Sequence, residues 1–249
     1  MTPRGTAPLF PSGVVALALA GCGGKTLDIG SDSVSQPGCT PSVLYADDFS
    51  SDTLENYEFP FGADYAVVDG VLQQVAQPGI ALPDAVDRTA VIRPELLAGA
   101  SDYVVEADGR IRDRTDSQGL FGLAFRAGPA GEHYSFLWNG NSEHAVPHWQ
   151  VEKSYDLELD YSYLGGGFGT GEESPAYALG TWVHLRVSVT GTRFRGQVDV
   201  HDGRGLVTVY DVTDASDPFA SGSVGFRSGW LYGTNFIEFD NFTITSSCG

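Results

Sequence analysis

Apolar and polar residues alternate in many short runs between residues 45 and 245, and no stretch of comparable length has a convincing helical period. Alternation with period two is typical of β-strands that have one face in a core and the other in water. The segment "WVHLRVSVT" (182–190) shows the pattern clearly. The sequence therefore predicts an all-β fold, a two-sheet antiparallel β-sandwich, with strands at 103–111, 119–127, 182–190, 194–202, 223–228 and 236–245.

Turn residues separate or interrupt these runs. The segments "VVDGV", "VTGTR" and "HDGRG" favour tight turns. In the last expected strand, Ile237 and Phe239 share one parity and Phe242 and Ile244 share the other, which predicts a β-bulge near residues 240–241. The stretch "PELLAG" allows a single helical turn at most.

Acidic residues line one side of "SYDLELDYSY" (154–163), where Asp156, Glu158 and Asp160 alternate with Tyr and Leu. This row has three interpretations: the solvated face of an ordinary strand, a metal site, or the carboxylates of a sugar-cleaving enzyme. The surrounding run, residues 149–163, keeps one parity and is long for a single strand. It is either two strands with a tight turn near residues 153–156 or one long bent strand.

The first residues have the character of an export signal. Arg4 precedes an apolar stretch that ends at Cys22 and is too short to span a bilayer comfortably. Residues 19–22, Leu-Ala-Gly-Cys, resemble the lipobox of bacterial lipoproteins, which implies cleavage before Cys22 and lipid attachment to it. A plain secretory signal with a chance cysteine is the alternative. We expect a signal peptide at 1–21, a flexible tether at 22–38 and one folded domain at 39–249.

Two further cysteines, Cys39 and Cys248, lie at opposite ends of the expected domain. Exported chains meet an oxidising compartment, so this even pair predicts one disulfide that joins the two ends, with two reduced thiols as the alternative. A zinc site is disfavoured because neither cysteine has a Cys or His nearby.

Several stretches together resemble the concanavalin A-like lectin/glucanase superfamily: "YADDFSSDTLENYEF", "VVDGVLQQ", "GLFGLAFRA", "ALGTWVHLRVSVTG", "GQVDVHDGRG" and "GSVGFRSGW" followed by "IEFDNFTIT". Within it, the chain is similar to the laminin-G-like and laminarinase-like jelly rolls of bacterial exported proteins, over residues 43–245. The resemblance implies a jelly-roll sandwich and does not by itself define an activity.

Laminarinase-type glycoside hydrolases carry a strand motif, ExDxxE or ExDxE, that supplies a nucleophile, a helper and an acid/base. By this resemblance Glu158 stands at the nucleophile and Asp160 at the helper, but Ser162 or Tyr163 stands where the proton donor belongs. A retaining mechanism needs a second carboxyl group about 5 Å from the first. Glu152 is the candidate for that group.

Aromatic residues cluster beside amides and carboxylates between residues 134 and 163. Such a mixture suits a glycan, whose C–H faces pack on aromatic rings and whose hydroxyls bind polar groups. The candidate ligand-binding residues are Tyr134, Trp138, His148, Trp149 and Tyr161, with Trp138 and Trp149 expected to be the most exposed. The alternative is that most of them belong to the core. The glycine-rich segment 165–174 could cover the cleft or simply connect two strands.

The same resemblance implies a structural Ca²⁺ on the side away from the sugar cleft, held by Asp240 with Asp48 or Asp47 opposite. Carboxylate oxygens suit this hard cation. The alternative is that Asp240 only satisfies backbone groups of the bulge.

Charge and absent motifs narrow the function. Fourteen Lys+Arg against 32 Asp+Glu give a formal charge of −18, which repels nucleic acids and anionic lipids. The sequence has no HExxH, CxxC or GxSxG. We therefore expect a monomeric, exported, lipid-anchored protein that binds a carbohydrate or another extracellular ligand without catalysis and touches the membrane only through its lipid. The resemblance to lipoproteins of two-membrane bacteria implies, from Gly23 after Cys22, the outer rather than the inner membrane. A laminarinase-type glycoside hydrolase and a structural or adhesive surface module are the alternatives.

Overall fold

A computed structural model describes residues 40–60, 65–74, 88–97, 99–112, 119–140, 148–155, 161–164, 175–229 and 236–247. Contacts divide the chain into residues 1–33 and a folded unit of residues 34–249. The expected signal peptide, the tether, Cys22 and both cysteines of the expected disulfide lie outside the described residues. In the described part, no helix is long and apolar enough to cross a membrane.

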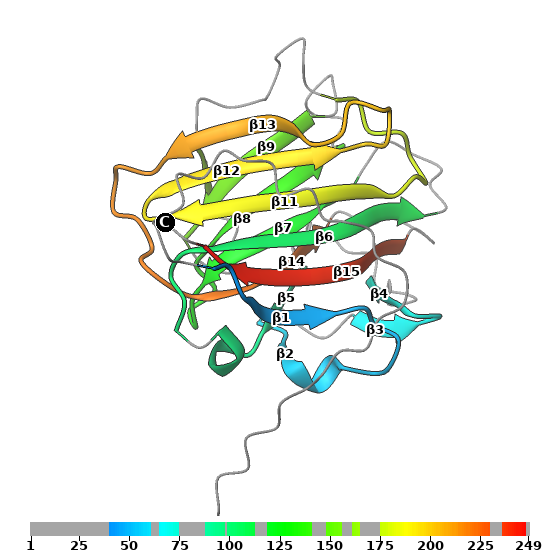
Figure 1. Cartoon of the computed structure of the whole chain (residues 1–249), viewed down its shortest axis with the longest axis horizontal. Helices are drawn as coiled ribbons and strands as arrows, with labels where there is room; N and C mark the ends of the chain where they lie inside the picture. Colours follow the sequence, from blue (N-terminus) through cyan, green and yellow to red (C-terminus); the bar gives the residue numbers. More distant parts are fainter. Residues whose placement is uncertain are drawn as a thin grey trace, which may run out of the picture. The chain divides into compact units, whose positions relative to one another are not determined.

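The larger sheet, sheet A, is antiparallel and has the order β13-β12-β11-β6-β15-β4-β3 (Figure 1). Two short strands share one side of β15: β4 pairs with its first residues, and β1 pairs with its last ones. The strands are β1 (Val43–Asp47), β3 (Tyr65–Val68), β4 (Val71–Gln74), β6 (Tyr103–Arg112), β11 (Val183–Thr190), β12 (Arg193–Asp199), β13 (Val207–Thr213) and β15 (Phe236–Ser246).

The second sheet, sheet B, is also antiparallel and has the order β10-β9-β8-β7-β14-β5-β2. Its strands are β2 (Tyr57–Glu58), β5 (Arg88–Ile92), β7 (Leu120–Ala127), β8 (His133–Asn139), β9 (His148–Ser154), β10 (Tyr161–Tyr163) and β14 (Ser223–Gly229). Two short 3₁₀ helices, η1 (Leu54–Asn56) and η2 (Pro94–Leu97), complete the described elements. The predicted all-β, two-sheet antiparallel sandwich is confirmed.

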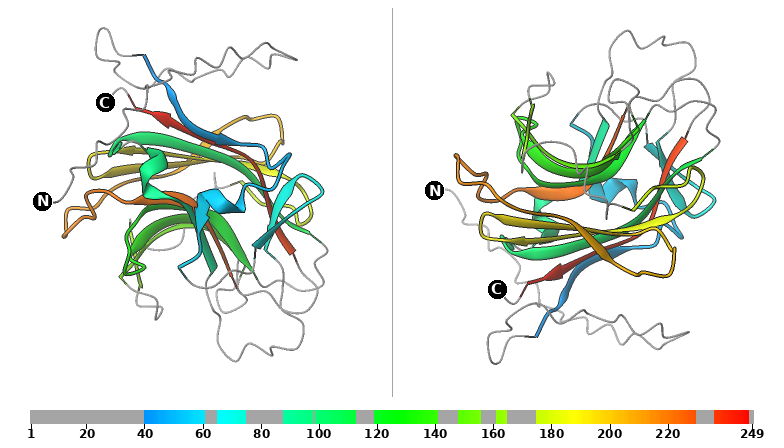
Figure 2. Two further views of the ribbon diagram at one scale, coloured as in Figure 1. Left: turned by 90° about the horizontal axis from the view of Figure 1, so that it is seen from below. Right: turned by 90° about the horizontal axis from the view of Figure 1, so that it is seen from above.

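The two sheets differ in burial. Along β6 and β11 of sheet A, buried residues alternate with partly exposed ones, as expected for a sheet with one wet face. Along β7, β8, β9 and β14 of sheet B, every residue is buried. Sheet B is bowed, and its concave side faces away from sheet A (Figure 2). Polar side chains on that concave side are therefore removed from water as thoroughly as those of the core.

Aromatic rings fill the space between the sheets. Phe226 of sheet B packs against Phe239 and Phe242 of sheet A, with ring centroids 4.4 and 4.6 Å apart. Burial of each such ring contributes roughly 1.5–3 kcal/mol. Gly196 makes room for a further ring, because a Cβ there would lie 2.8 Å from the ring of Phe136. Aromatic rings of one sheet thus face aromatic rings or, at Gly196, a glycine of the other sheet.

Most local predictions are confirmed. The expected strands match β6, β7, β11, β12, β14 and β15 to within a few residues. "VVDGV" forms the β3–β4 hairpin, in which Asp69 and Gly70 both have positive φ, as a type I′ turn requires. The register of β15 shifts between Asp240 and Thr243, so the predicted bulge is present. The run 149–163 contains two strands, because β9 and β10 pair antiparallel.

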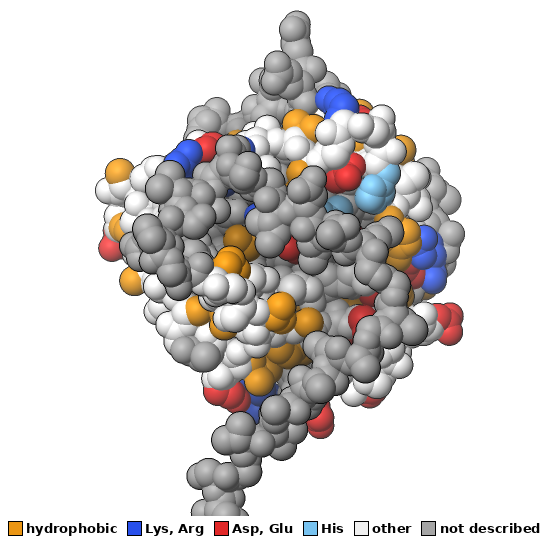
Figure 3. Space-filling model, viewed as in Figure 1, with side chains coloured by type: hydrophobic (Ala, Val, Ile, Leu, Met, Phe, Trp, Pro, Cys, Tyr) orange, Lys and Arg blue, Asp and Glu red, His pale blue; other side chains and the backbone are white. Residues whose placement is uncertain are grey.

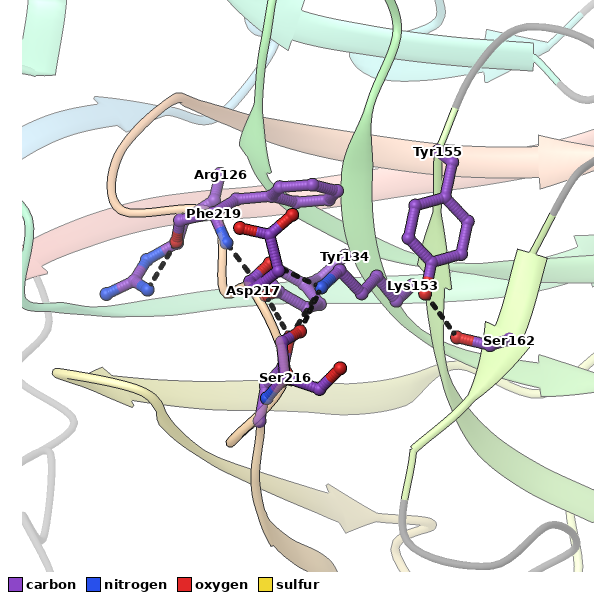
Figure 4. Close-up of polar contacts among 9 residues, drawn as sticks. Arg126, Tyr134, Lys153, Tyr155, Ser162, Ser216, Asp217 and Phe219 are labelled. Carbon is purple, nitrogen blue, oxygen red and sulfur yellow. Dashed lines mark hydrogen bonds and ion pairs between the residues drawn. The ribbon is translucent and has the colours of Figure 1, made fainter.

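One end of β9 is fastened to the segment that precedes β14 (Figure 4). Lys153 is 2% exposed, and its Nζ donates to Asp214 Oδ2 at 2.8 Å and to the carbonyl oxygens of Ser216 and Asp217 at 2.9 and 2.6 Å. The Phe219 ring lies 4.8 Å from the ammonium. Lys153 points toward sheet A, away from the concave side. This cluster therefore holds β9 on its core-facing side, and the polar groups described below lie on its concave side.

The outer face of sheet A carries both positively and negatively charged side chains, which form ion pairs. Arg110 and Arg112 bind the fully buried Glu238 carboxylate at 2.6 and 2.5 Å, and His184 lies 2.8 Å from Asp108. In the view of Figure 1, the charged side chains of the described surface are scattered in small groups (Figure 3). Within the described residues, this face therefore has paired charges rather than one large charged patch.

Candidate functional site

Strand pairing places one set of polar residues on the concave side of sheet B. Residues directly opposite each other in antiparallel strands point to the same face. Glu152 of β9 lies opposite Ser135 of β8 and Tyr163 of β10, and Arg227 of β14 lies opposite Thr89 of β5. The alternate residues of these strands point to the opposite face, toward sheet A, and include the aromatic residues of the core. The buried polar residues of the concave side are Thr89, His133, Ser135, Asn139, His148, Gln150, Glu152, Ser154 and Arg227.

Arg227 and Glu152 form the centre of this set. Arg227 Nη1 donates to Glu152 Oε2 and, at 2.6 Å, to Ser135 Oγ. Its distance to Ser154 Oγ is 3.4 Å. The two side chains of the ion pair are 2% and 4% exposed. A charge-assisted pair of this kind holds both groups in one geometry and stabilises the ionised carboxylate.

Amides and a histidine extend the network along β9. Gln150 Nε2 donates to Glu152 Oε1, while Gln150 Oε1 accepts from His148 Nε2 at 2.7 Å and from Asn139 Nδ2 at 3.4 Å. Burial, followed by the nearby Arg227 charge, lowers the pKa of His133 to about 3, so this ring is neutral at ordinary pH. The network therefore offers fixed donors and acceptors around a single ion pair.

Small residues on β7 and β14 leave the Arg227 side chain room to cross the sheet. Gly122 is opposite Arg227, and Ala124 is opposite Gly225. A Cβ at Gly225 would collide with the Ala90 carbonyl, and one at Gly122 with the Phe136 carbonyl. Only glycine fits at these positions, because the neighbouring backbones approach closely. The concave side of sheet B, called the floor below, therefore has little side-chain bulk at β7 and β14, and the guanidinium crosses it to reach β8 and β9.

The floor also carries the hydroxyl group of Thr89. Thr89 is 1% exposed and lies opposite Arg227 on the concave side. Within the described part of the chain, its Oγ1 makes no hydrogen bond. Burying a hydroxyl without a partner costs roughly 1–3 kcal/mol, so such a group marks a place where a ligand hydroxyl or a water would be stabilised.

Two tyrosines stand at the edge of the same face, on β10. Tyr161 and Tyr163 lie opposite Ser154 and Glu152, and their ring centroids are 5.4 Å apart. Burial, the hydrogen bond to Tyr161 and the Glu152 charge raise the pKa of Tyr163. Tyr161 is 37% exposed. The edge thus offers the apolar ring surface that the floor lacks.

The structure brings together three of the residues predicted from the sequence: His148, Glu152 and Tyr161. The other three aromatic candidates, Tyr134, Trp138 and Trp149, face sheet A and are 0%, 3% and 1% exposed, so the expectation that the tryptophans are exposed is wrong. The reason is that both faces of β8 and β9 are buried, and the large rings fill the wider space between the sheets. Trp149 Nε1 donates to the Pro175 carbonyl at 3.0 Å, and Tyr134 donates to Asp214 at 2.6 Å.

The acidic row of the sequence gives no site in the described structure. Glu158 and Asp160 lie outside the described residues, as does the glycine-rich segment 165–174. The strands of sheet B carry two acidic residues, Glu152 and Glu58, and Glu58 is on β2, five strands away, which is roughly 24 Å along the sheet at ordinary strand spacing. Glu152 binds Arg227, which suits a salt-bridge partner or an acceptor and does not suit a proton donor.

The predicted cation ligands lie beside the bulge of β15. Asp47 accepts hydrogen bonds from the hydroxyls of Tyr45, Thr53 and Tyr57 and from the Phe49 N–H, so its oxygens already serve the fold. A hollow of about 400 Å³ is lined by Asp47, Asp48 and Asn241, among others. Burial and the carboxylates of Asp108, Asp48 and Asp47 raise the pKa of Asp240. No group of three or more His, Cys, Asp or Glu among the described residues is arranged to bind a metal ion.

Sequence reasoning missed Arg227, Gln150, Ser135 and Thr89. The segment "SVGFRS" contains a signal for Arg227. Its valine and phenylalanine share one parity, and its glycine and arginine share the other. That pattern indicates a charged residue on a face that must accommodate it, but it does not identify the partner.

No protein-family model matches the chain, and no curated protein matches it. Solved structures share its fold. The carbohydrate-binding module CBM66 from Bacillus subtilis is 19% identical with a TM-score of 0.53, over 77% of this chain and 96% of that one. Winged bean acidic lectin, solved with methyl-α-D-galactose, is 11% identical with a TM-score of 0.55, over 84% and 99%.

A third similar structure belongs to an enzyme. The GH43 protein BlXynB from Bacillus licheniformis is 14% identical with a TM-score of 0.55, and the match covers 81% of this chain but 39% of that one. At such identities the likeness shows the fold alone, which is a lectin-like β-sandwich.

Proposed function

We propose that this protein is a non-catalytic carbohydrate-binding sandwich, with its site on the concave side of sheet B. The observation that carries the proposal is the buried hydrogen-bonding network of Arg227, Glu152 and Gln150 on that side. Sugar hydroxyls both donate and accept, so a fixed array of mixed donors and acceptors suits them. The fold shared with a carbohydrate-binding module and a lectin supports the proposal.

The described geometry favours binding over hydrolysis. Glycoside hydrolysis requires two carboxyl groups about 5–10 Å apart, one of them protonated. Glu152 and Glu58, the acidic residues in the strands of sheet B, are too far apart for that role, and Glu152 is engaged by Arg227. An adhesive module with a protein partner is a weaker alternative, because a buried polar network suits the hydroxyls of a sugar better than the largely apolar centre of a protein interface.

Glycan-array binding followed by calorimetry tests the proposal. We expect the protein to bind at least one glycan, Gln150→Ala and Tyr161→Ala to weaken binding about tenfold or more, and Gln197→Ala to leave it unchanged. Gln197 is the matched amide on the outer face of sheet A, where it donates to Thr208 Oγ1 at 3.3 Å. Release of reducing sugar by the protein, or binding to no glycan on the array, would contradict the proposal.

We also propose that the chain is exported and anchored by lipid on Cys22, in the outer rather than the inner membrane, as a monomer. The lipobox-like sequence and Gly23 support this. Labelled fatty acid should enter the wild-type protein and be absent from Cys22→Ser. Label that persists in the variant would refute the anchor.

A disulfide between Cys39 and Cys248 is the third part of the proposal. Ser42 and Ser246 are hydrogen-bonded in the described structure, at 2.8 Å from Ser246 N to Ser42 O, and the two cysteines lie a few residues beyond them. Non-reducing peptide mapping of the exported protein should recover the linked pair. Two free thiols in that material would refute it.

Bound Ca²⁺ near the bulge of β15 completes the proposal. Because the oxygens of Asp47 already accept four hydrogen bonds, Asp240 and Asp48 would hold the ion and Asp47 would position the loop. The raised pKa of Asp240 supports this, since its cause includes neighbouring carboxylates whose repulsion a cation would relieve.

A further inference from the structure

We propose that the concave site selects uncharged glycans and excludes acidic ones, and that Glu152 is the residue that determines this choice. The inference rests on the proposed carbohydrate-binding function and adds the chemical class of the ligand. Its basis is the way in which the one arginine of the floor is held.

Among the described buried residues of the floor, one carries a positive and one a negative charge, while Glu58 lies exposed on β2 at the edge of the same face. Arg227 is the cation and Glu152 the anion, and Arg227 Nη1 contacts the carboxylate directly. Lys153, the neighbour of Glu152 in the chain, points to the opposite side and binds Asp214. His133 is neutral because its pKa is lowered to about 3. Among the residues that the structure describes, the site therefore has no uncompensated positive charge with which to attract an anion.

An arginine that recognises a carboxylate normally presents its N–H groups to the ligand as a fork. Here Nη1 serves Glu152 and Ser135, so a ligand carboxylate would have to replace Glu152 or lie beside it. Two carboxylates in a water-excluded setting repel each other strongly. The formal charge of −18 for the chain adds repulsion at longer range for any polyanionic glycan.

A neutral sugar meets no such penalty. The vicinal hydroxyls of a sugar each donate and accept, and the floor places an acceptor carboxylate next to donor N–H groups of Arg227 and Gln150. The Thr89 hydroxyl, buried and without a partner in the described structure, lies in the same row as Arg227 and can serve a further ligand hydroxyl. The arrangement therefore stabilises the hydroxyl groups of a bound ligand and disfavours its carboxylates.

The test compares neutral glycans with uronate-bearing and sialylated ones on the wild-type protein at low and high salt. We expect neutral glycans alone to bind, and high salt not to rescue the acidic ones, because the exclusion is local. Glu152→Gln should raise the affinity for acidic relative to neutral glycans by about tenfold or more. Glu238→Gln is the matched control, since Glu238 is another buried carboxylate held by arginines but on sheet A, and it should change nothing.

Comparable binding of acidic and neutral glycans by the wild type would overturn the inference and leave the proposed function intact. Binding to no glycan would overturn the proposed function itself. If Glu152→Gln does not fold, as judged by circular dichroism, Tyr163→Lys tests the same charge argument, because it adds a positive charge directly opposite Glu152 and leaves Gln150 in place. A folded variant whose affinity for acidic relative to neutral glycans does not rise would show that charge on the floor does not set the choice.

Discussion

The Arg227 guanidinium on β14 contacts the Glu152 carboxylate on β9, although β7 and β8 lie between these two strands. The ion pair therefore links four neighbouring strands of sheet B from their concave side. Both charges are almost completely removed from water, so each depends on the other for compensation.

Removing one partner of this pair should cost more than removing both. Arg227→Met leaves a buried carboxylate without its cation, and we expect it to lower the free energy of unfolding by about 3–5 kcal/mol. The double variant Arg227→Met/Glu152→Leu should lose clearly less than the sum of the two single losses. Urea unfolding of the four proteins measures the coupling. Additive losses would mean that neither side chain stabilises the other.

On the opposite face of β9, Asp214 should make the protein sensitive to acid. Burial by itself raises the pKa of Asp214, but the hydrogen bonds from Lys153 and Tyr134 outweigh burial and hold the pKa below its usual value of 3.8. A carboxyl with a depressed pKa contributes stability above its unfolded pKa and loses it as the pH falls through the folded value. Asp214→Asn should therefore flatten the fall of Tm below about pH 4.

The control for Asp214 is Asp211, whose pKa is lowered by its hydrogen bond from Arg193 on the surface. That pair is 63% and 35% exposed, so solvent screens it and Asp211→Asn should alter the acid limb much less. Equal effects of the two variants would contradict a special role for the buried pair.

His184 should give the protein a stability that fades in alkali. Burial alone lowers its pKa, but hydrogen bonds and charges from Asp108 and Glu106 outweigh burial and raise the pKa to about 9. A raised pKa contributes stability that is complete below the unfolded value of 6.5 and is lost as the pH rises through 9. The contribution is at most about 3 kcal/mol, reduced by solvent because the side chain is 25% exposed.

Chemical unfolding of wild type and His184→Gln at about pH 6 and pH 10 measures this contribution. The difference between the two proteins should be large at the lower pH and small at the higher one. His201→Gln, at a side chain that is 56% exposed, is the control and should change the free energy of unfolding little at either pH. A His184→Gln effect that is equal at both pH values would refute the assignment.

The core and surface positions of sheet A could be predicted from the sequence, because one face of this sheet is exposed to water. In β6 and β11, apolar and polar residues alternate with the burial, so parity alone separates core from surface. Even the bulge could be located, since the parity of the apolar residues changes across Asp240 and Asn241. Local pattern and tertiary burial agree in β6 and β11.

Sheet B was not readable in the same way. Every residue of β8 and β9 is buried, so parity does not reveal which face meets sheet A, and the expectation that Trp138 and Trp149 are exposed is wrong. The ion pair of the site joins residues 75 positions apart. No single strand's pattern contains such a pairing, because it depends on which strands become neighbours in the folded sheet.

The proposed Ca²⁺ should stabilise the fold through Asp240. Burial and the charges of Asp108, Asp48 and Asp47 raise the pKa of Asp240, so the ionised carboxylate is a source of repulsion in the absence of a cation. A ligand at about 100 times its Kd stabilises by about 2.7 kcal/mol, so millimolar Ca²⁺ should raise Tm and a chelator should reverse the change. Asp240→Asn should melt no lower than the wild type in chelator and should lose the response to Ca²⁺. Asp52→Asn should keep that response. Asp52 is an exposed acid in the segment that follows Asp48, and its Oδ1 accepts a hydrogen bond from the Leu54 N–H. A wild-type Tm that is identical with Ca²⁺ and with chelator would refute the site.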